Sequence, residues 1–433
     1  MKLLPLLAFA ISAAPVQAQL SAPEKRMIQT VERESERSVA LLERLVNQNS
    51  GSLNLPGVEA VGRMMRAELE PLGFNVRWVP MTETKRAGHI VATHKGNGRG
   101  KRMLLIGHLD TVFEPDSPFQ KFVRKSATEA EGPGVGDDKG GMVVMVAALR
   151  AMQAAGTLKN ADIEIVLTGD EEDNGNPIEI ARRDLIAAGK RADVALDFEG
   201  LSQESGRDMG AIARRSSGAW EVVAKGRTGH SSGIFSAGSG NGAIYELSRI
   251  ITAFRSELPE PNLTFNVGLI AGGTTAALDQ DKIRATATGK TNIIPETAIA
   301  RGDIRTLSRD QEERVRAKMR DIVARSMPGT SAELRFDPDT YPPMAPTEGN
   351  KALLARLNIV NRDMGLPEMQ PIDPLKRGAG DIGFVAEDVD GLVGLGAAGE
   401  RSHAPGETVD LPSIDRQAKR AAILMSRLAR EKR

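Results

Sequence analysis

Histidine and carboxylate side chains with the spacing of metal ligands gather around one stretch of the chain, residues 103–141. An apolar run, residues 103–106, predicts a buried strand, and His108 and Asp110 follow at its end. Residues i and i+2 of an extended chain point to the same side, so this imidazole and this carboxylate leave the strand together. A glycine-rich turn then places Asp137 ahead of an apolar helix. The pattern indicates a metal site, although a surface histidine beside solvated acids is the alternative for His108 taken alone.

Three further apolar runs are predicted to be strands, and each is followed by histidine or carboxylate side chains. Strands that alternate with helices predict a mostly parallel sheet, and ligands bind beyond the carboxyl ends of such strands. Any one acidic strand end could be a solvated loop, but four together, with two of the five histidines, favour one shared site. The runs and the residues that follow them are 162–167 with Glu171 and Glu172, 192–196 with Glu199, and 391–395 with His403.

These side chains could hold two zinc ions and use them to activate water. Two cations ~3.5–4 Å apart lower the pKa of a shared water and hold both oxygens of a tetrahedral intermediate. A free carboxylate must also accept the proton of the zinc-bound water, and Glu171, which diverges from Glu172, is the predicted general base. Asp110 is placed to accept a hydrogen bond from the second ring nitrogen of His108. Cobalt or manganese would accept the same ligands. The predicted ligands are His108, Asp137, Glu172, Glu199 and His403.

The composition excludes several other kinds of site. The chain has no cysteine, so thiolate ligands, a cysteine nucleophile and disulfides are excluded. Its 57 basic residues balance 57 acidic ones, which argues against a nucleic-acid partner. Residues 1–18 carry Lys2, an apolar stretch and a small-residue site ending at Ala18, so they predict a cleaved signal peptide; an uncleaved anchor is the alternative. We therefore expect a periplasmic or secreted protein without a membrane span.

The middle of the chain follows a different pattern. After a linker predicted at residues 202–209, strands and helices occur in the order βαββαβ, which fits a ferredoxin-like insert. The predicted fold is therefore an α/β domain with a mostly parallel sheet flanked by helices, interrupted by a smaller α+β domain. Residues 19–211 and 342–433 would form the catalytic domain, and residues 212–341 the insert.

Eight motifs resemble those of the di-zinc exopeptidases, the family of carboxypeptidase G, acetylornithine deacetylase and succinyl-diaminopimelate desuccinylase. The resemblance covers nearly the whole mature chain. It implies that Asp137 bridges two zinc ions and that the peptide bond after it is cis. His108 and Glu199 would complete one zinc site, and Glu172 and His403 the other. The motifs are GHLDTV, GPGVGDDKGG, TGDEE, DFEG, GRTGHSS, NIIP with GDIR, GAGD and HAPGETVD.

The same resemblance assigns roles to residues of the insert, which would act as a lid and dimerisation domain. His230 would reach across a homodimer to the substrate carbonyl or its oxyanion, and Asn292 would lie in a similar place. Arg305 would bind the free carboxylate of the substrate, a task that suits the guanidinium fork. A surface histidine in a loop is the alternative for His230. The loop that lines the same pocket is matched by Gly378, Gly380 and Asp381.

The sequence departs from the family pattern in two places. Asp197 competes with Glu199 for the ligand role. Tyr341 lies near the position where glutamate-specific members carry a basic residue, so a preference for a C-terminal glutamate is in doubt. Arg214 and Arg215 could supply a substitute charge, but we expect them to be solvated.

The predicted activity is hydrolysis of the amide bond to a C-terminal amino acid, as in a metallocarboxypeptidase or an N-acyl-amino-acid amidohydrolase. The substrates would be peptides or N-acyl amino acids. A dipeptidase or aminopeptidase of the same family is one alternative. An exported binding protein without catalysis is another, but such a protein would have no use for the unliganded acid Glu171.

Overall fold

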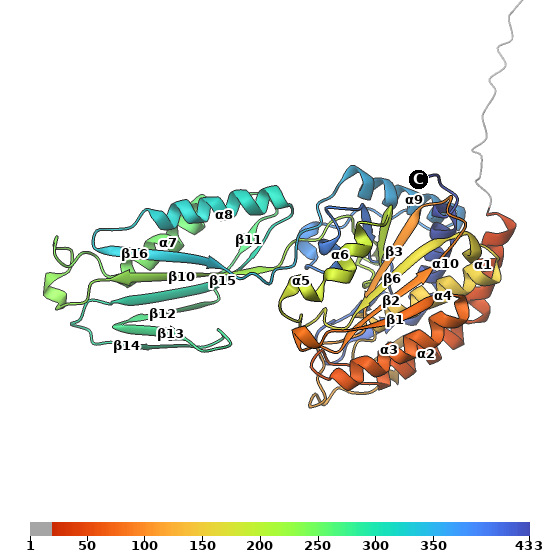
Figure 1. The fold of residues 1–433 in the computed structure, drawn as a ribbon, viewed down its shortest axis with the longest axis horizontal. Helices are drawn as coiled ribbons and strands as arrows, with labels where there is room; N and C mark the ends of the chain where they lie inside the picture. The colour runs from red at the N-terminus through yellow and green to blue at the C-terminus, as the bar shows by residue number, and fades with distance from the viewer. Residues whose placement is uncertain (1–19) are drawn as a thin grey trace, which may run out of the picture.

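The computed structural model describes residues 20–433, so the predicted signal peptide lies outside the described residues. Figure 1 shows two lobes, each built on its own sheet. The main lobe contains a six-stranded sheet, and the insert lobe, residues 218–336, contains a five-stranded one. Within residues 20–433 no helix combines the length and apolarity needed to cross a bilayer.

The sheet of the main lobe is mostly parallel. Its strands, in spatial order, are β1 (Asn75–Pro80), β2 (Gly88–His94), β6 (Asp162–Thr168), β3 (Arg102–His108), β7 (Val194–Asp197) and β17 (Gly391–Val393). Strand β2 pairs antiparallel with both neighbours, whereas β6, β3, β7 and β17 pair in parallel. The carboxyl ends of these four strands therefore meet at one edge of the sheet, where a ligand site is expected.

Helices cover both faces of this sheet. Strand β3 is apolar on both sides, as in buried parallel sheets: Met103 and Leu105 pack into one core, and Leu104 and Ile106 into the other. The first core is built with α1 (Ala22–Arg33), α2 (Ser35–Asn47), α3 (Leu55–Leu69), α4 (Lys139–Ala154), α9 (Glu348–Asp363) and α10 (Leu411–Leu428). The second core includes α6 (Arg183–Gly189), which follows the short helix α5 (Ile178–Ala181).

The insert lobe has an antiparallel sheet with two helices packed against it (Figure 1). Strand β16 pairs with β10, β10 with β15, and β15 with both β11 and β12. This arrangement is the split-βαβ order predicted from the sequence, with β11 and β12 together in the place of one predicted strand. The elements are β10 (Gly218–Gly226), α7 (Ala243–Glu257), β11 (Thr264–Phe265), β12 (Leu269–Gly273), β15 (Thr297–Arg305), α8 (Arg309–Ala324), β16 (Thr330–Phe336) and a hairpin of β13 (Thr275–Leu278) and β14 (Ala285–Thr288).

Two chain segments run side by side between the lobes. Arg214 is bridged to Met344 and Ser217 to Tyr341, both antiparallel. The residues before them were predicted to be a linker, but they form a hairpin of β8 (Gln203–Glu204) and β9 (Arg207–Asp208). The domain limits predicted at residues 211 and 342 stay predictions.

Candidate metal centre

The five predicted metal ligands lie together at the carboxyl edge of the main sheet. His108 is the last residue of β3, and Asp137 lies just before α4. Glu172 follows β6 and Glu199 follows β7. His403 lies in the loop between β18 (Gly399–Glu400) and β19 (Thr408–Asp410). Parallel pairing of β3 with β6 and β7 thus brings together side chains that are far apart in the sequence.

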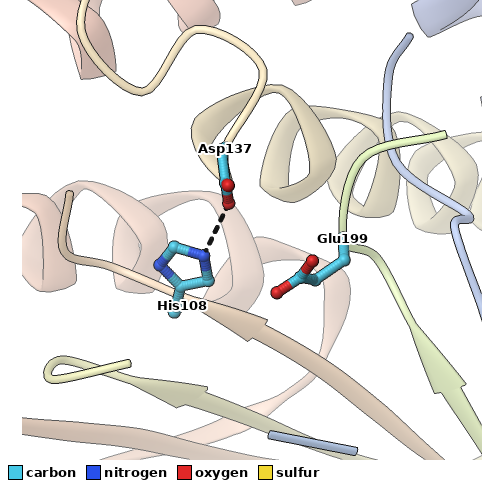
Figure 2. A group of neighbouring side chains, drawn as sticks. All are labelled: His108, Asp137 and Glu199. Carbon is cyan, nitrogen blue, oxygen red and sulfur yellow. Dashed lines mark hydrogen bonds and ion pairs between the residues drawn. The ribbon is translucent and has the colours of Figure 1, made fainter. Parts of the chain in front are cut away.

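The ligands form two groups of three that share Asp137. In each group, one nitrogen or oxygen atom per residue lies within 4.8 Å of the others. Nε2 of His108 is 3.0 Å from Oδ1 of Asp137 (Figure 2). Nε2 of His403 is 3.2 Å from Oδ2 of the same carboxylate. Because its two oxygens face different histidines, Asp137 is placed to bridge two ions. The groups are His108, Asp137 and Glu199, and Asp137, Glu172 and His403.

This donor set fits a pair of divalent cations. Imidazole and carboxylate groups suit zinc, cobalt and manganese. Oε1 of Glu172 is buried and has no hydrogen-bond partner within residues 20–433, a costly situation that a cation would relieve. Asp197, the competitor of Glu199, belongs to neither group. Its Oδ1 accepts a hydrogen bond from the backbone N–H of Glu199 at 3.2 Å, and burial and the charge of Glu199 raise its pKa to about 8. The peptide bond between Asp137 and the next residue is cis, as the family resemblance implies.

Asp110 contacts more of the site than the sequence suggested. Nδ1 of His108 lies 3.1 Å from the backbone oxygen of Asp110 and 3.4 Å from Oδ1 of its carboxylate. That buried carboxylate accepts hydrogen bonds from Ser52 Oγ at 2.6 Å and from the backbone N–H groups of Glu171 and Glu172, each at 3.0 Å. Asp110 therefore positions both glutamates as well as lying beside His108.

The carboxylate of Glu171 is free of hydrogen bonds in the described part of the chain. Its backbone is fixed on both sides, by Asp110 at the N–H and by the hydroxyl of Tyr341, which donates to its carbonyl oxygen at 2.7 Å. Burial raises the pKa of Glu171 well above its usual value; Glu199 and other nearby acids add to this, and His108 opposes it. A carboxyl group with a raised pKa that belongs to neither ligand group suits a general base.

The two histidines of the cluster hold protons strongly when no cation is bound. Burial favours neutral His108, but hydrogen bonds and ion pairs with Asp110 and Asp137 outweigh it and raise its pKa well above the usual value. Hydrogen bonds to Asp137 and Glu172 raise the pKa of His403 to about 11. A cation that binds here must therefore displace protons.

The predicted residues of the insert lobe do not all reach this cluster. His230 and Asn292 lie together, since the residue after His230 donates its N–H to the carbonyl of Asn292 at 2.9 Å. Both lie beyond Gly226, the end of β10 that is distant from the main lobe, and His230 is exposed with Nδ1 bonded to a serine hydroxyl. Arg305 ends β15 near the main lobe, and its Nε is 3.3 Å from Oδ2 of Asp303. The roles of His230, Asn292 and Arg305 stay predictions.

The expectation that Arg214 and Arg215 are solvated is wrong. Both side chains are buried. Arg214 forms an ion pair of 2.6 Å with Glu199 and donates from Nε to the carbonyl of Gly378 at 2.8 Å. Gly380 allows this approach, because a Cβ there would lie 2.7 Å from Nη1 of Arg214. The predicted pocket loop therefore packs against Arg214, the counter-ion of a candidate metal ligand.

A fully buried arginine, Arg182, was missed by the sequence analysis. It donates from Nε to Asp381 at 2.7 Å and from Nη1 to Asp170 at 2.6 Å, and its Nη2 bonds to the hydroxyl of Tyr341 at 2.7 Å. Tyr341 in turn donates to the backbone of Glu171. This network joins the pocket loop, the end of β6 and the return segment from the insert lobe.

Glu407 is a second positioning residue that the sequence analysis missed. Its carboxylate accepts hydrogen bonds from the backbone N–H groups of Gly134, Gly136 and Asp137 at 2.8–3.0 Å. It thereby fixes the turn that carries the shared ligand. The only sequence signal was its place within the HAPGETVD motif.

Comparison with known proteins identifies the family. Residues 104–429 match the model of peptidase family M20/M25/M40. The chain belongs to this family. Carboxypeptidase G2 of Pseudomonas sp. (strain RS-16) is 29% identical to this M20 chain over 273 residues, which are 62% of this chain and 59% of that protein. The match thus spans less than two thirds of that relative. The family predicted from the motifs is confirmed.

Solved structures establish the fold of this M20 chain. A tripeptidase (SAV1512) from Staphylococcus aureus subsp. aureus Mu50 has a TM-score of 0.71 at 18% identity, covering 92% of this chain and 99% of that one. YxeP of Bacillus subtilis, a dinuclear metal binding peptidase of the M20 family, has a TM-score of 0.63 at 16% identity, covering 92% and 99%. The predicted α/β fold with a mostly parallel sheet is confirmed.

Proposed function

We propose that this M20 protein is an exported, metal-dependent hydrolase that cleaves the amide bond to a C-terminal amino acid, either from a peptide or from an N-acyl amino acid. The observation that carries the proposal is the shared position of Asp137 in two ligand groups, with Glu171 beside them and in neither. The similarity to carboxypeptidase G2 supports the choice of the C-terminal bond over an N-terminal one.

The residues of the chain have separate tasks in this reaction. Two bound divalent cations would supply Lewis acidity that activates water and polarises the scissile carbonyl. Glu171, held by Asp110 and Tyr341 through its backbone, accepts a proton from the attacking water and delivers it to the leaving amine. Arg305 would bind the free carboxylate of the substrate through its guanidinium.

A panel of paired substrates tests this function. Zinc-loaded protein should hydrolyse an N-acyl amino acid and refuse the same compound with its C-terminal carboxylate converted to an amide. Cleavage only of substrates with a free α-amine would favour a dipeptidase or aminopeptidase instead. If protein with two bound cations hydrolyses neither kind, the result contradicts the proposed function and favours the alternative of a binding protein without catalysis. Protein carrying Glu171→Gln is the control for contaminating hydrolases.

We also propose that the protein acts as a homodimer through the insert lobe, with His230 completing the site of the partner. Two features support this. His230 lies at the distant end of β10, and large apolar side chains are exposed on the same lobe: Phe235, Tyr245 and Ile270 are 61%, 51% and 58% exposed. Apolar exposure of this kind marks interaction surfaces.

Mixed dimers test this arrangement. His230→Ala protein and Glu171→Gln protein should each be nearly inactive, and mixing them after subunit exchange should restore activity, because one site of each mixed dimer combines two intact residues. Absence of restored activity in mixtures shown to contain mixed dimers would contradict a role for His230 across the dimer. Export is tested separately: the mature protein recovered from the periplasm or medium should begin at residue 19.

A further inference from the structure

The guanidinium of Arg377 lies next to the candidate metal centre and forms no hydrogen bond within the described part of the chain. Its side chain is only 17% exposed, and its Nε is buried with no partner among residues 20–433. The nearest carboxylate oxygen is Oε2 of Glu199, at 3.7 Å from Nη2, which is beyond hydrogen-bond distance. A largely buried guanidinium whose donors are unpaired is costly, so this position calls for an anion.

Glu199 cannot be that anion. Its Oε2 already forms the 2.6 Å ion pair with Arg214, and Glu199 belongs to the ligand group of His108 and Asp137. Two guanidinium groups thus face one carboxylate that also has a predicted cation to bind. Of the two guanidinium groups, Arg377 is therefore the one without a carboxylate at hydrogen-bond distance among residues 20–433.

The loop that carries Arg377 is held in place from several sides. Arg214 donates to the carbonyl of Gly378 at 2.8 Å, and Arg215 donates to the carbonyl of Leu375 at 3.2 Å. The side chain of Asp373 caps the short 3₁₀ turn η5 (Pro374–Lys376), accepting from a backbone N–H at 2.9 Å. Because the loop is fixed before a ligand binds, little ordering would be needed on binding.

We propose that Arg377 is a specificity-determining residue that binds a carboxylate of the substrate beside the metal centre. A guanidinium binds a carboxylate through two parallel hydrogen bonds, which gives both affinity and orientation. The proposal rests on the function proposed above. If Arg305 holds the α-carboxylate of the substrate's C-terminal residue, Arg377 binds the side-chain carboxylate of that residue. The enzyme then prefers an acidic C-terminal residue, although it has tyrosine and no basic residue at position 341. The alternative is that Arg377 binds the α-carboxylate itself, which has the same chemistry.

Three substrates show which of the two carboxylates Arg377 binds. They are an N-acyl glutamate, the corresponding N-acyl glutamine, and the N-acyl glutamate with its α-carboxylate converted to an amide. For Arg377→Gln we expect KM for the N-acyl glutamate to rise about 30-fold or more, because a buried charge partner is lost. The kcat should change much less. The variant should have little effect on whichever analogue lacks the carboxylate that Arg377 binds. Arg377→Lys, which keeps the charge, should recover part of the affinity.

Two controls separate recognition from structure. Arg335→Gln removes an arginine of the insert lobe that is 63% exposed and pairs with Glu333, and it should leave all three activities unchanged. The zinc content of Arg377→Gln should equal that of the wild type, and its unfolding midpoint should be no lower, because an unpaired buried charge is removed.

The outcomes distinguish this proposal from the proposed function. Suppose that the wild type hydrolyses the panel, and that Arg377→Gln changes KM by the same factor for all three substrates or for none of them. Arg377 then does not bind a carboxylate of the substrate. If the wild type hydrolyses nothing, the proposed function fails, and calorimetric binding of glutarate to zinc-loaded protein decides the role of Arg377. Binding weakened about tenfold or more in Arg377→Gln would support the carboxylate site, and equal binding would overturn it.

Discussion

Replacement of Asp110 by asparagine tests how one buried carboxylate organises the site. Oδ1 of Asp110 accepts the backbone N–H of Glu171, and Oδ2 accepts the backbone N–H of Glu172 and the hydroxyl of Ser52. Asparagine offers only one acceptor oxygen. In either orientation of its amide, at least one of the two backbone N–H groups faces an NH₂ group and is left unpaired.

The magnitude follows from this count. A buried donor without a partner costs about 1–3 kcal/mol, so the free energy of unfolding of Asp110→Asn should fall by that amount. Burial opposes the charged form of Asp110, but hydrogen bonds from His108, Ser52 and a backbone N–H outweigh burial and lower the pKa of Asp110. Asp110 is therefore an anion in the folded protein, and asparagine removes that charge. Loss of such a partner behind a metal ligand typically lowers metal affinity or activity about 10–100-fold.

Urea unfolding, zinc content and kcat/KM measured on the same preparations provide the assay. Ser52→Ala is the matched control, because it removes one donor and leaves the carboxylate bonded to both backbone N–H groups. We expect it to cost about 1 kcal/mol and to leave kcat/KM within a few-fold of the wild type. The reasoning is refuted if Asp110→Asn retains stability, zinc and activity, or if Ser52→Ala has the same effect.

Three further predictions concern the base, a buried ion pair and the protons of the cluster. Glu171→Gln should keep its metal content while kcat falls about 10²–10⁴-fold; loss of metal would show that Glu171 is a ligand. Arg182→Met should lower the free energy of unfolding by about 3–5 kcal/mol, because it leaves two buried aspartates unpaired. Arg191→Met, at an exposed ion pair, should change the free energy of unfolding by less than about 1 kcal/mol. Similar values for the two variants would contradict the network. Zinc binding near pH 7 should release protons and tighten as the pH rises, because the raised pKa values of His108 and His403 keep both protonated in metal-free protein. Calorimetric heats of zinc binding that do not depend on the ionisation enthalpy of the buffer would contradict this release of protons.

The five ligands could be predicted from the sequence because each lies next to an element with a strong local pattern. His108, Glu172 and Glu199 follow apolar runs that form buried strands, and parallel pairing places the ends of such strands at one edge. Asp137 lies just before a helix that is buried along most of its length. Local pattern therefore fixed which residues reach the edge, and topology brought them together.

The supporting residues could not be predicted in the same way. Glu407 bonds to the turn of Asp137 from about 270 positions away, and Arg182 bonds to Asp381 across 199 positions. Only the folded chain brings these partners together, and a charged residue far from its partner looks in sequence like a solvated one. Arg214, which we expected to be solvated, shows this error directly.

The central claim is that Asp137 bridges two cations, and anomalous diffraction at the zinc edge from zinc-soaked crystals tests it most directly. We predict two peaks per chain about 3.5–4 Å apart, one beside His108 and the other beside His403, with Asp137 bound to both. A single peak, a peak away from Asp137, or a zinc ion bound by Glu171 would contradict the account.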